Sequence, residues 1–233
     1  MNELKFCWYS SVCEQDAVWL DQYLREAERL KMPFSMYLDR CSQEVFNKVI
    51  LHPLCVGVHS QDDPDREYDE TAKQVVFEEA CKRAQYVIST DIDETWDRDF
   101  YNKFYHYERD LNWDSLKVHF PCLWDSPDQI RVDGQFAGCS LDRTKIYRTT
   151  DRLWIHKNAC VQGAYLRNRR AVELSTEINC IHWGYMTREL REAHKAKWDR
   201  VYGAHNEKNP YDLWAMMCNE EQFPPIVEKH NLF

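Results

Sequence analysis

The sequence lacks the close cysteine pairs of a zinc-binding protein. Its 233 residues include ten Cys, but no two of them lie closer together than Cys7 and Cys13. CxxC pairs and zinc-ribbon spacing are therefore excluded. We predict that the cysteines are reduced and mostly buried, which is the usual state of cysteine in a cytoplasmic protein.

The sequence also lacks a long apolar run. No stretch approaches the roughly 18 uncharged residues that a membrane-spanning helix needs. The first residues, MNELKFCWYSS, do not have the basic-then-apolar layout of a signal peptide. We therefore expect no transmembrane segment and a cytoplasmic location.

The chain has fewer positively charged than negatively charged side chains. The chain has 30 Lys and Arg against 39 Asp and Glu, which gives a net charge of −9 and argues against general affinity for nucleic acid. Residues 131–170 are the exception, with nine Lys and Arg against three Asp. This basic segment is either a solvated, salt-bridged face or a surface that meets an anionic partner.

The chain does contain short apolar runs that alternate with helical patterns. The runs at 4–10, 34–38 and 86–90 indicate strands, and the patterns at 14–31 and 70–84 indicate helices. Such an alternation predicts an α/β fold with a mostly parallel central sheet flanked by helices. The length favours a single domain, residues 1–233, with an elaborated C-terminal part.

A cluster of carboxylates follows the last of these strands, in YVISTDIDETWDRDF. Asp91 and Asp93, separated by one residue, can direct their oxygens at one point beyond a strand end, where parallel sheets bind ligands. Unpaired carboxylates there would repel each other, and a divalent cation removes that cost. Hard oxygen ligands favour Mg²⁺ or Mn²⁺, which usually bridge to phosphate oxygens. The alternative is a set of acids at a helix N-terminus, which we favour for Asp97 and Asp99.

The order of motifs resembles that of the GT-A glycosyltransferases of the family 2 type found in bacteria and phages. YVISTDIDE resembles the strand and DxD signature of the family, and LDRCSQE resembles the end of its second strand. AKQVVFEEA resembles the helix before the DxD strand, and IHWGY resembles a C-terminal segment. The resemblance covers roughly residues 4–110 and 178–203. It implies a GT-A domain with a nucleotide-sugar-binding half at 1–110 and an acceptor-side half at 111–233.

The resemblance also implies roles for individual residues. The implied metal ligands are Asp91, Asp93 and His182. The implied donor-binding residues are Ser10, Asp39, Lys73, Asp91 and Lys195, with Lys197 as an alternative to Lys195. Lys73 replaces an Arg of the family pattern and cannot make a bidentate contact. A buried core histidine is the other interpretation of His182.

The activity that the resemblance implies is transfer of a sugar from a nucleoside diphosphate sugar, with UDP favoured, to a hydroxyl acceptor. Mn²⁺ or Mg²⁺ would neutralise the departing diphosphate. An inverting enzyme also needs a base, for which Asp151 and His156 are the candidates, with Asp133 and Glu173 left open. The expected acceptor is an anionic polymer that contacts the basic segment, such as the hydroxymethylated DNA of a phage in its bacterial host. A polysaccharide or a lipid-linked sugar is the alternative.

Two other classes of protein remain open. DIDET also fits the DxDxT signature of haloacid-dehalogenase-like phosphatases, in which Asp91 would be the nucleophile and Asp93 the acid and base. That signature usually comes near the start of its domain, whereas here a long α/β segment precedes it. The second alternative is a non-catalytic nucleotide-binding module that keeps the pocket but has no base.

Overall fold

The computed structural model describes residues 4–62, 71–110, 112–132, 142–149, 153–154, 165–166, 171–202, 220 and 224–230. The chain divides into two compact units, each made of several segments. The first unit contains Met1–Asp93, His106–Lys117 and Thr144–Thr176, and the second contains Glu94–Tyr105, Val118–Arg143 and Glu177–Phe233. Both units thus take segments from either side of residue 110, where the sequence suggested a division between halves.

The first unit is built on a mostly parallel sheet. Four parallel strands lie in the order β3-β2-β1-β4, and β9 pairs antiparallel with β4. The strands are β1 Leu4–Cys13, β2 Phe34–Asp39, β3 Cys55–Gln61, β4 Ala84–Ser89 and β9 Arg143–Arg148. The predicted α/β class with a mostly parallel central sheet is therefore confirmed.

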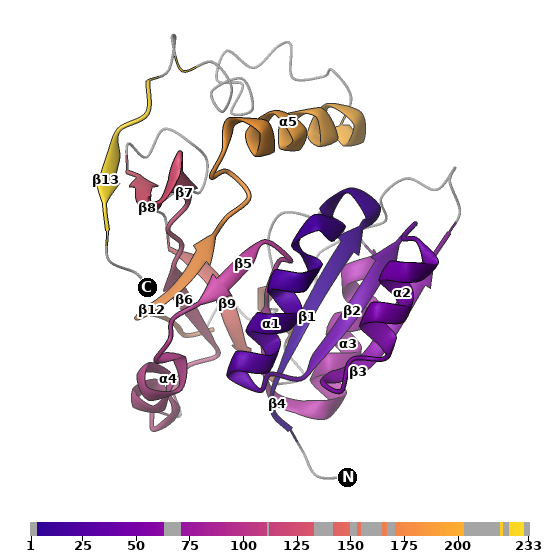
Figure 1. Cartoon of the computed structure of the whole chain (residues 1–233). Helices are drawn as coiled ribbons and strands as arrows, with labels where there is room; N and C mark the ends of the chain where they lie inside the picture. The colour runs from indigo at the N-terminus through magenta and orange to yellow at the C-terminus, as the bar shows by residue number, and fades with distance from the viewer. Residues whose placement is uncertain are drawn as a thin grey trace. The chain divides into compact units, whose positions relative to one another are not determined.

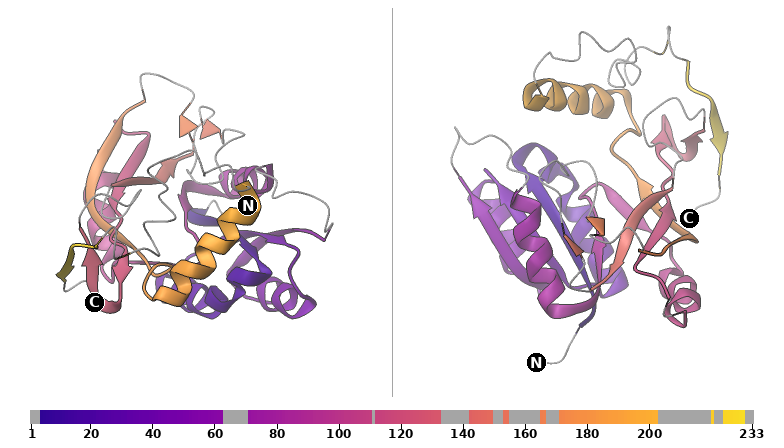
Figure 2. Two further views of the ribbon diagram at one scale, coloured as in Figure 1. Left: turned by 90° about the horizontal axis from the view of Figure 1, so that it is seen from above. Right: turned by 180° about the vertical axis from the view of Figure 1, so that it is seen from behind.

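Helices cover both faces of this sheet. In Figure 1 α1 and α2 lie on the near face, and α3 lies on the far face, which Figure 2 shows from behind. The helices are α1 Leu20–Leu30, α2 Gln43–Ile50 and α3 Thr71–Arg83. The first predicted helix, 14–31, divides into a 3₁₀ turn at Glu14–Trp19 and α1.

The central strand β1 is buried on both sides, because successive side chains alternate between the two faces. Cys7 and Tyr9 pack with Phe77 of α3 in one cluster. On the opposite face the ring of Tyr23 lies 5.3 Å from that of Trp8 and 5.5 Å from that of Phe34. A strand covered on both faces is typical of a parallel sheet between helix layers, which fixes β1 as the centre of this unit.

Seven cysteines in the described part of the chain are free. Three of them, Cys7, Cys122 and Cys180, are buried and four are half-buried, so the prediction that most are buried is wrong for these seven. Burial raises the pKa of the Cys7 thiol from its ordinary value of 9.0 to about 12. The folded protein therefore holds this proton more tightly than the unfolded chain does. The stability that this provides is complete below pH 9 and is lost as the pH rises from 9 towards 12.

We expect the Cys7→Ala variant to show this linkage. Between pH 9.5 and 11 the free energy of unfolding of the wild-type protein should fall more steeply than that of the variant, by about 1.4 kcal/mol per pH unit. Urea unfolding curves measured at several pH values check this difference in slope. If the free energy of unfolding depends on pH with the same slope in both proteins, the Cys7 thiol does not titrate as described.

The second unit contains antiparallel strand pairings and helical segments. Strand β12 pairs with β5, and β13, β8 and β7 form a three-stranded sheet in that order. Its elements are β5 Glu94–Trp96, β7 Leu123–Trp124, β8 Ser126–Arg131, α5 Arg188–Tyr202 and β13 Val227–Lys229. It also holds α4 Phe100–Glu108 as far as Tyr105 and β12 Glu173–His182 from Glu177 onward. Three further strands of the chain are β6 Ser115–His119, β10 Leu153–Trp154 and β11 Tyr165–Leu166.

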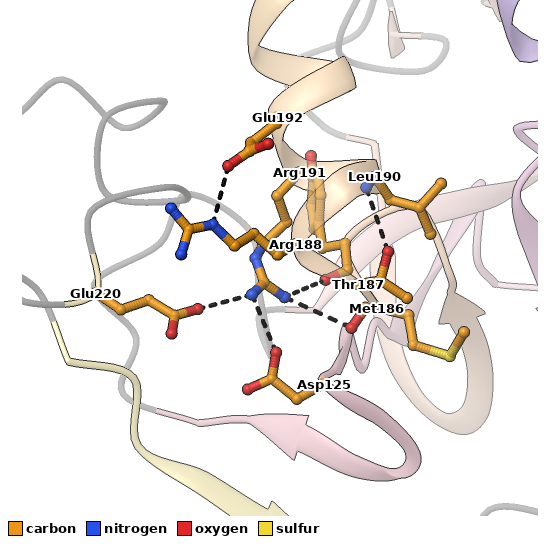
Figure 3. A network of polar contacts seen from close by, with 9 residues as sticks. Asp125, Met186, Thr187, Arg188, Leu190, Arg191, Glu192 and Glu220 are labelled. Atoms are coloured by element: carbon orange, nitrogen blue, oxygen red, sulfur yellow. Dashed lines mark hydrogen bonds and ion pairs between the residues drawn. The ribbon is translucent and has the colours of Figure 1, made fainter.

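Arg191 joins the start of α5 to two other parts of this unit. Its guanidinium donates to Asp125 at 3.0 Å and to Glu220 at 2.7 Å (Figure 3). It also donates to the Tyr185 carbonyl at 2.9 Å. The same group lies 4.1 Å from the centre of the Trp124 ring. The side chain is 1% exposed, so a buried charge holds the helix to the β7–β8 hairpin.

None of the helices in the described ranges combines the length and the apolar character needed to span a membrane.

Candidate functional site

The candidate site lies at the carboxyl edge of the parallel strands in the first unit. Asp39 is the last residue of β2, Ser10 lies near the end of β1, and Asp91 follows β4 by two residues. The connection from β1 to β2 runs to one side of β1, and the connection from β3 returns the chain to its other side at β4. Such a topological switch point is where open α/β sheets bind their ligands.

The loop that carries the two aspartates is fastened to β1. The Ser10 hydroxyl donates to the carbonyl oxygen of Thr90, and the Thr90 amide donates to the carbonyl of Tyr9 at 3.3 Å. Ser10 and Thr90 are both buried. These bonds extend the pairing of β1 and β4 beyond the end of β4, so the position of Asp91 follows from the sheet. Ser10 therefore has a structural role, and contact with the donor stays a prediction for it.

The two aspartates differ in exposure. The Asp91 side chain is 42% exposed, whereas Asp93 is buried. Within the described ranges, no three His, Cys, Asp or Glu side chains gather closely enough to hold a metal ion by themselves. Mg²⁺ is usually bound by one or two carboxylates, with water and substrate phosphates as its other ligands. The exposed carboxylate of Asp91 fits a cation of that kind, which protein and substrate would share.

Lys145 lies beside Asp91, and the sequence did not single it out for this site. Its Nζ atom is 3.6 Å from Oδ2 of Asp91, and its side chain is 6% exposed. Lys145 comes from β9, which pairs antiparallel with β4. This pairing joins segments more than fifty residues apart, and no local pattern in the sequence indicates it.

Asp39 is buried in a second polar cluster on the same edge. Its carboxylate accepts a bidentate contact from Arg40, with Nε at 3.2 Å and Nη2 at 2.7 Å. It also accepts a hydrogen bond from the Gln61 side chain at the end of β3. The Arg40 backbone is left-handed, with φ of 52°, and its amide donates to the Gln61 carbonyl at 2.7 Å. Asp39 is therefore held in place at the edge, while its contact with a nucleotide stays a prediction.

The remaining candidates in helices have simpler placements. Lys73 lies in the first turn of α3. Lys195 lies in α5 of the second unit and is half-buried. The donor-binding roles of Lys73 and Lys195 stay predictions.

His182 ends β12 in the second unit, where it is buried among rings. Its ring centre lies 4.3 Å from that of Tyr185, 5.4 Å from that of Phe120 and 6.5 Å from that of His194. This environment is that of a core histidine, which was the alternative interpretation of the sequence. The role of His182 as a metal ligand stays a prediction.

Asp97 has a structural role in the second unit. Its carboxylate accepts hydrogen bonds from the backbone and side-chain amides of Asn179, at 2.6 and 3.0 Å, and from Lys103 at 2.8 Å. Asp99 is exposed and lies 3.7 Å from the Lys103 amine. Asp97 and Asp99 also lie directly before α4, which begins at Phe100, so both acids stand at a helix N-terminus as predicted.

The basic segment is only partly described. Its four described cations contact rings or acids of their own unit. Arg131 lies 4.5 Å from the Trp124 ring, Arg143 4.2 Å from the Phe120 ring, Arg148 4.5 Å from the Trp113 ring, and Lys145 beside Asp91. The candidate bases Asp151 and His156 lie outside the described residues, as does Asp133. Glu173, the remaining candidate base, forms an ion pair with Lys117 at 2.9 Å and accepts from Thr144, contacts that compete with proton transfer.

No protein-family model matches the chain, and no curated protein matches its sequence. Among solved structures, residues 1–349 of S. aureus TarS resemble it at 12% identity and a TM-score of 0.45, over 94% of this chain and 72% of that one. The same fragment in complex with UDP-GlcNAc gives 12% identity and a TM-score of 0.46, over 93% and 71%. A longer TarS structure gives 13% identity and a TM-score of 0.49, over 95% of this chain and 44% of that one. These likenesses are partial, and the candidate site rests on the chain's own strand order and side chains.

Proposed function

We propose that this chain is a GT-A-type glycosyltransferase that transfers a sugar from a nucleoside diphosphate sugar, with UDP favoured, to a hydroxyl acceptor. One observation carries the proposal. Asp39 and Asp91 stand at the carboxyl ends of β2 and β4, on either side of β1, at the switch point of the parallel sheet. An acidic side chain on each side of such a crevice can bind the two ends of a nucleotide, the base at one and the metal-bound diphosphate at the other.

In this proposal the two ends of the site have different binding roles. Asp39, fixed by Arg40 and Gln61, faces the nucleobase. Asp91, with Asp93 as the further ligand proposed, would hold Mn²⁺ or Mg²⁺. When bound, the metal neutralises charge on the departing diphosphate. The two hydrogen bonds that join Thr90 to Ser10 and Tyr9 of β1 hold the aspartate loop in position before the substrate arrives, which is the preorganisation that electrostatic stabilisation requires.

The base and the acceptor in this proposal are inferred from the sequence alone. We propose Asp151 or His156 as the base, and an anionic polymer such as hydroxymethylated phage DNA, or a polysaccharide, as the acceptor. For a duplex acceptor, binding should weaken as the salt concentration rises, because released counterions drive it. A reaction rate that does not depend on salt would argue for an uncharged acceptor.

A thermal-shift experiment tests the donor proposal. UDP and GDP, each with Mn²⁺, are added at about 100 times their dissociation constants to the full chain. The nucleotide that binds should raise the melting temperature by about 5–10 °C, and either nucleotide or metal alone should raise it less. A panel in which no nucleoside diphosphate stabilises the protein, with or without metal, would contradict the proposed function.

The same preparation also distinguishes the phosphatase from the transferase. Hydrolysis of a nucleotide sugar in the absence of an acceptor would support an active transferase. Phosphate release from a simple phosphate ester, with inhibition by beryllium fluoride, would instead support an Asp91 nucleophile and would contradict the proposal. Binding without any turnover would indicate the non-catalytic module.

A further inference from the structure

The fold places an ammonium group against the acidic loop. Strand β9 runs antiparallel to β4, and Ile146 is paired with Ile88. Lys145 is therefore next to the carboxyl end of β4, immediately before the loop that carries Asp91. Its Nζ atom lies 3.6 Å from Oδ2 of Asp91. The register of the strands, and not a flexible side chain at the surface, brings this charge to the site.

Lys145 is unusually buried for a lysine. Its side chain is 6% exposed, whereas that of Lys117 in the same unit is 41% exposed. Taking an ammonium group out of water is costly unless negative charge compensates for it, and lysines are therefore seldom buried. The acid beside Lys145 is itself 42% exposed. The lysine thus approaches from the protein interior an acid whose other side faces solvent.

The contact between the two groups is longer than a charge-assisted hydrogen bond. A charge-assisted hydrogen bond between an ammonium and a carboxylate is about 2.7–2.9 Å long, so 3.6 Å is an ion pair without full hydrogen-bond contact. An ammonium group has three N–H donors and binds phosphate as a compact point charge. A phosphate oxygen that binds beside Oδ2 of Asp91, the carboxylate oxygen next to Lys145, comes within reach of the same ammonium group.

We propose that Lys145 binds the diphosphate of the nucleotide donor directly, as a fixed positive charge beside Asp91. This inference rests on the proposed function and assigns a binding residue that the sequence motifs do not include. In it the diphosphate meets positive charge from two sources, the cation held at Asp91 and the β9 ammonium. Part of the affinity for the diphosphate therefore persists without metal.

Isothermal titration of UDP and of uridine tests the inference, with GDP and guanosine titrated in parallel. The wild-type protein is compared with Lys145→Met, Lys145→Arg and the matched control Lys117→Met, in Mn²⁺ and separately in EDTA. In K145M the affinity for the diphosphate should fall about 10- to 100-fold under both conditions, as for the loss of one charged hydrogen bond, while the affinity for the nucleoside stays unchanged. K145R should retain most of the affinity, and K117M all of it, because Lys117 pairs with Glu173.

The outcomes separate the inference from the function on which it rests. If the wild-type protein binds no nucleoside diphosphate even with Mn²⁺, the proposed function fails. If it binds UDP but K145M binds UDP equally well, or loses uridine and UDP to the same extent, only the inference is overturned. Should K145M not fold, the wild-type protein in EDTA decides, because it should bind UDP at least about 10-fold more tightly than uridine. Equal affinities there would overturn the inference without any variant.

Discussion

Replacing Asp91 with Asn is expected to lower the rate of nucleotide-sugar cleavage by about 100- to 1,000-fold. This is the usual loss when one preorganised group that stabilises developing charge is removed. Asn keeps the shape of the side chain but supplies no negative charge to a cation. The Asp91 carboxylate is the more exposed member of the acidic pair and so the one that a substrate can share. The stabilisation of the protein by UDP with Mn²⁺ should be lost together with the rate.

The assay is UDP release from a UDP-sugar, with and without Mn²⁺, and circular dichroism checks that the variant is folded. Asp99→Asn is the matched control. It removes the same charge eight residues away, where the side chain is 55% exposed and 3.7 Å from Lys103. D99N should retain at least half of the wild-type rate, because single exposed ion pairs contribute little. Full turnover by D91N, or an equal loss in D99N, would remove Asp91 from the proposed site.

The parallel part of the fold could be predicted from the sequence because its signals are local. An apolar run that ends in a polar residue predicts β2 and its terminal Asp39. The same pattern predicts β4 and the loop at Asp91. The helices predicted at 14–31 and 70–84 follow from the spacing of their apolar residues. Parallel strands joined by helices leave few possible arrangements, so local signals were sufficient to indicate the edge of the sheet.

The polar partners could not be predicted, because they depend on which distant strands pair. Asp97 and Asp91 look alike in the sequence, yet Asn179 and Lys103 bind Asp97 within the second unit, whereas Lys145 lies beside Asp91. The basic segment likewise reads as a single positive stretch. In the structure, Arg148 lies against the Trp113 ring and Lys145 at the acidic loop, so charges that are neighbours in sequence have separate roles.

Arg191 shows the same dependence on distant residues, and its removal should cause the largest loss of stability. Its guanidinium is 1% exposed and bound by Asp125 and Glu220 (Figure 3) and by the Tyr185 carbonyl. Arg191→Met keeps much of the apolar length of the side chain but leaves these oxygens without their donor. The free energy of unfolding of the second unit should fall by about 3 kcal/mol, the loss expected when one partner of a buried ion pair is removed.

Arg188→Met is the matched control, because Arg188 is one turn away on the same helix and its side chain is 70% exposed. It contacts Glu192 at 2.9 Å, an i,i+4 pair at the surface, and its loss should change stability by no more than about 0.5 kcal/mol. Urea unfolding gives the two free energies, and hydrogen exchange locates the change. In R191M the amides of α5 should exchange about 100-fold faster than in the wild-type protein, because 3 kcal/mol of local stability is lost. Equal effects of R188M and R191M would show that the charge of α5, and not the buried contacts of Arg191, holds this helix to the β7–β8 hairpin.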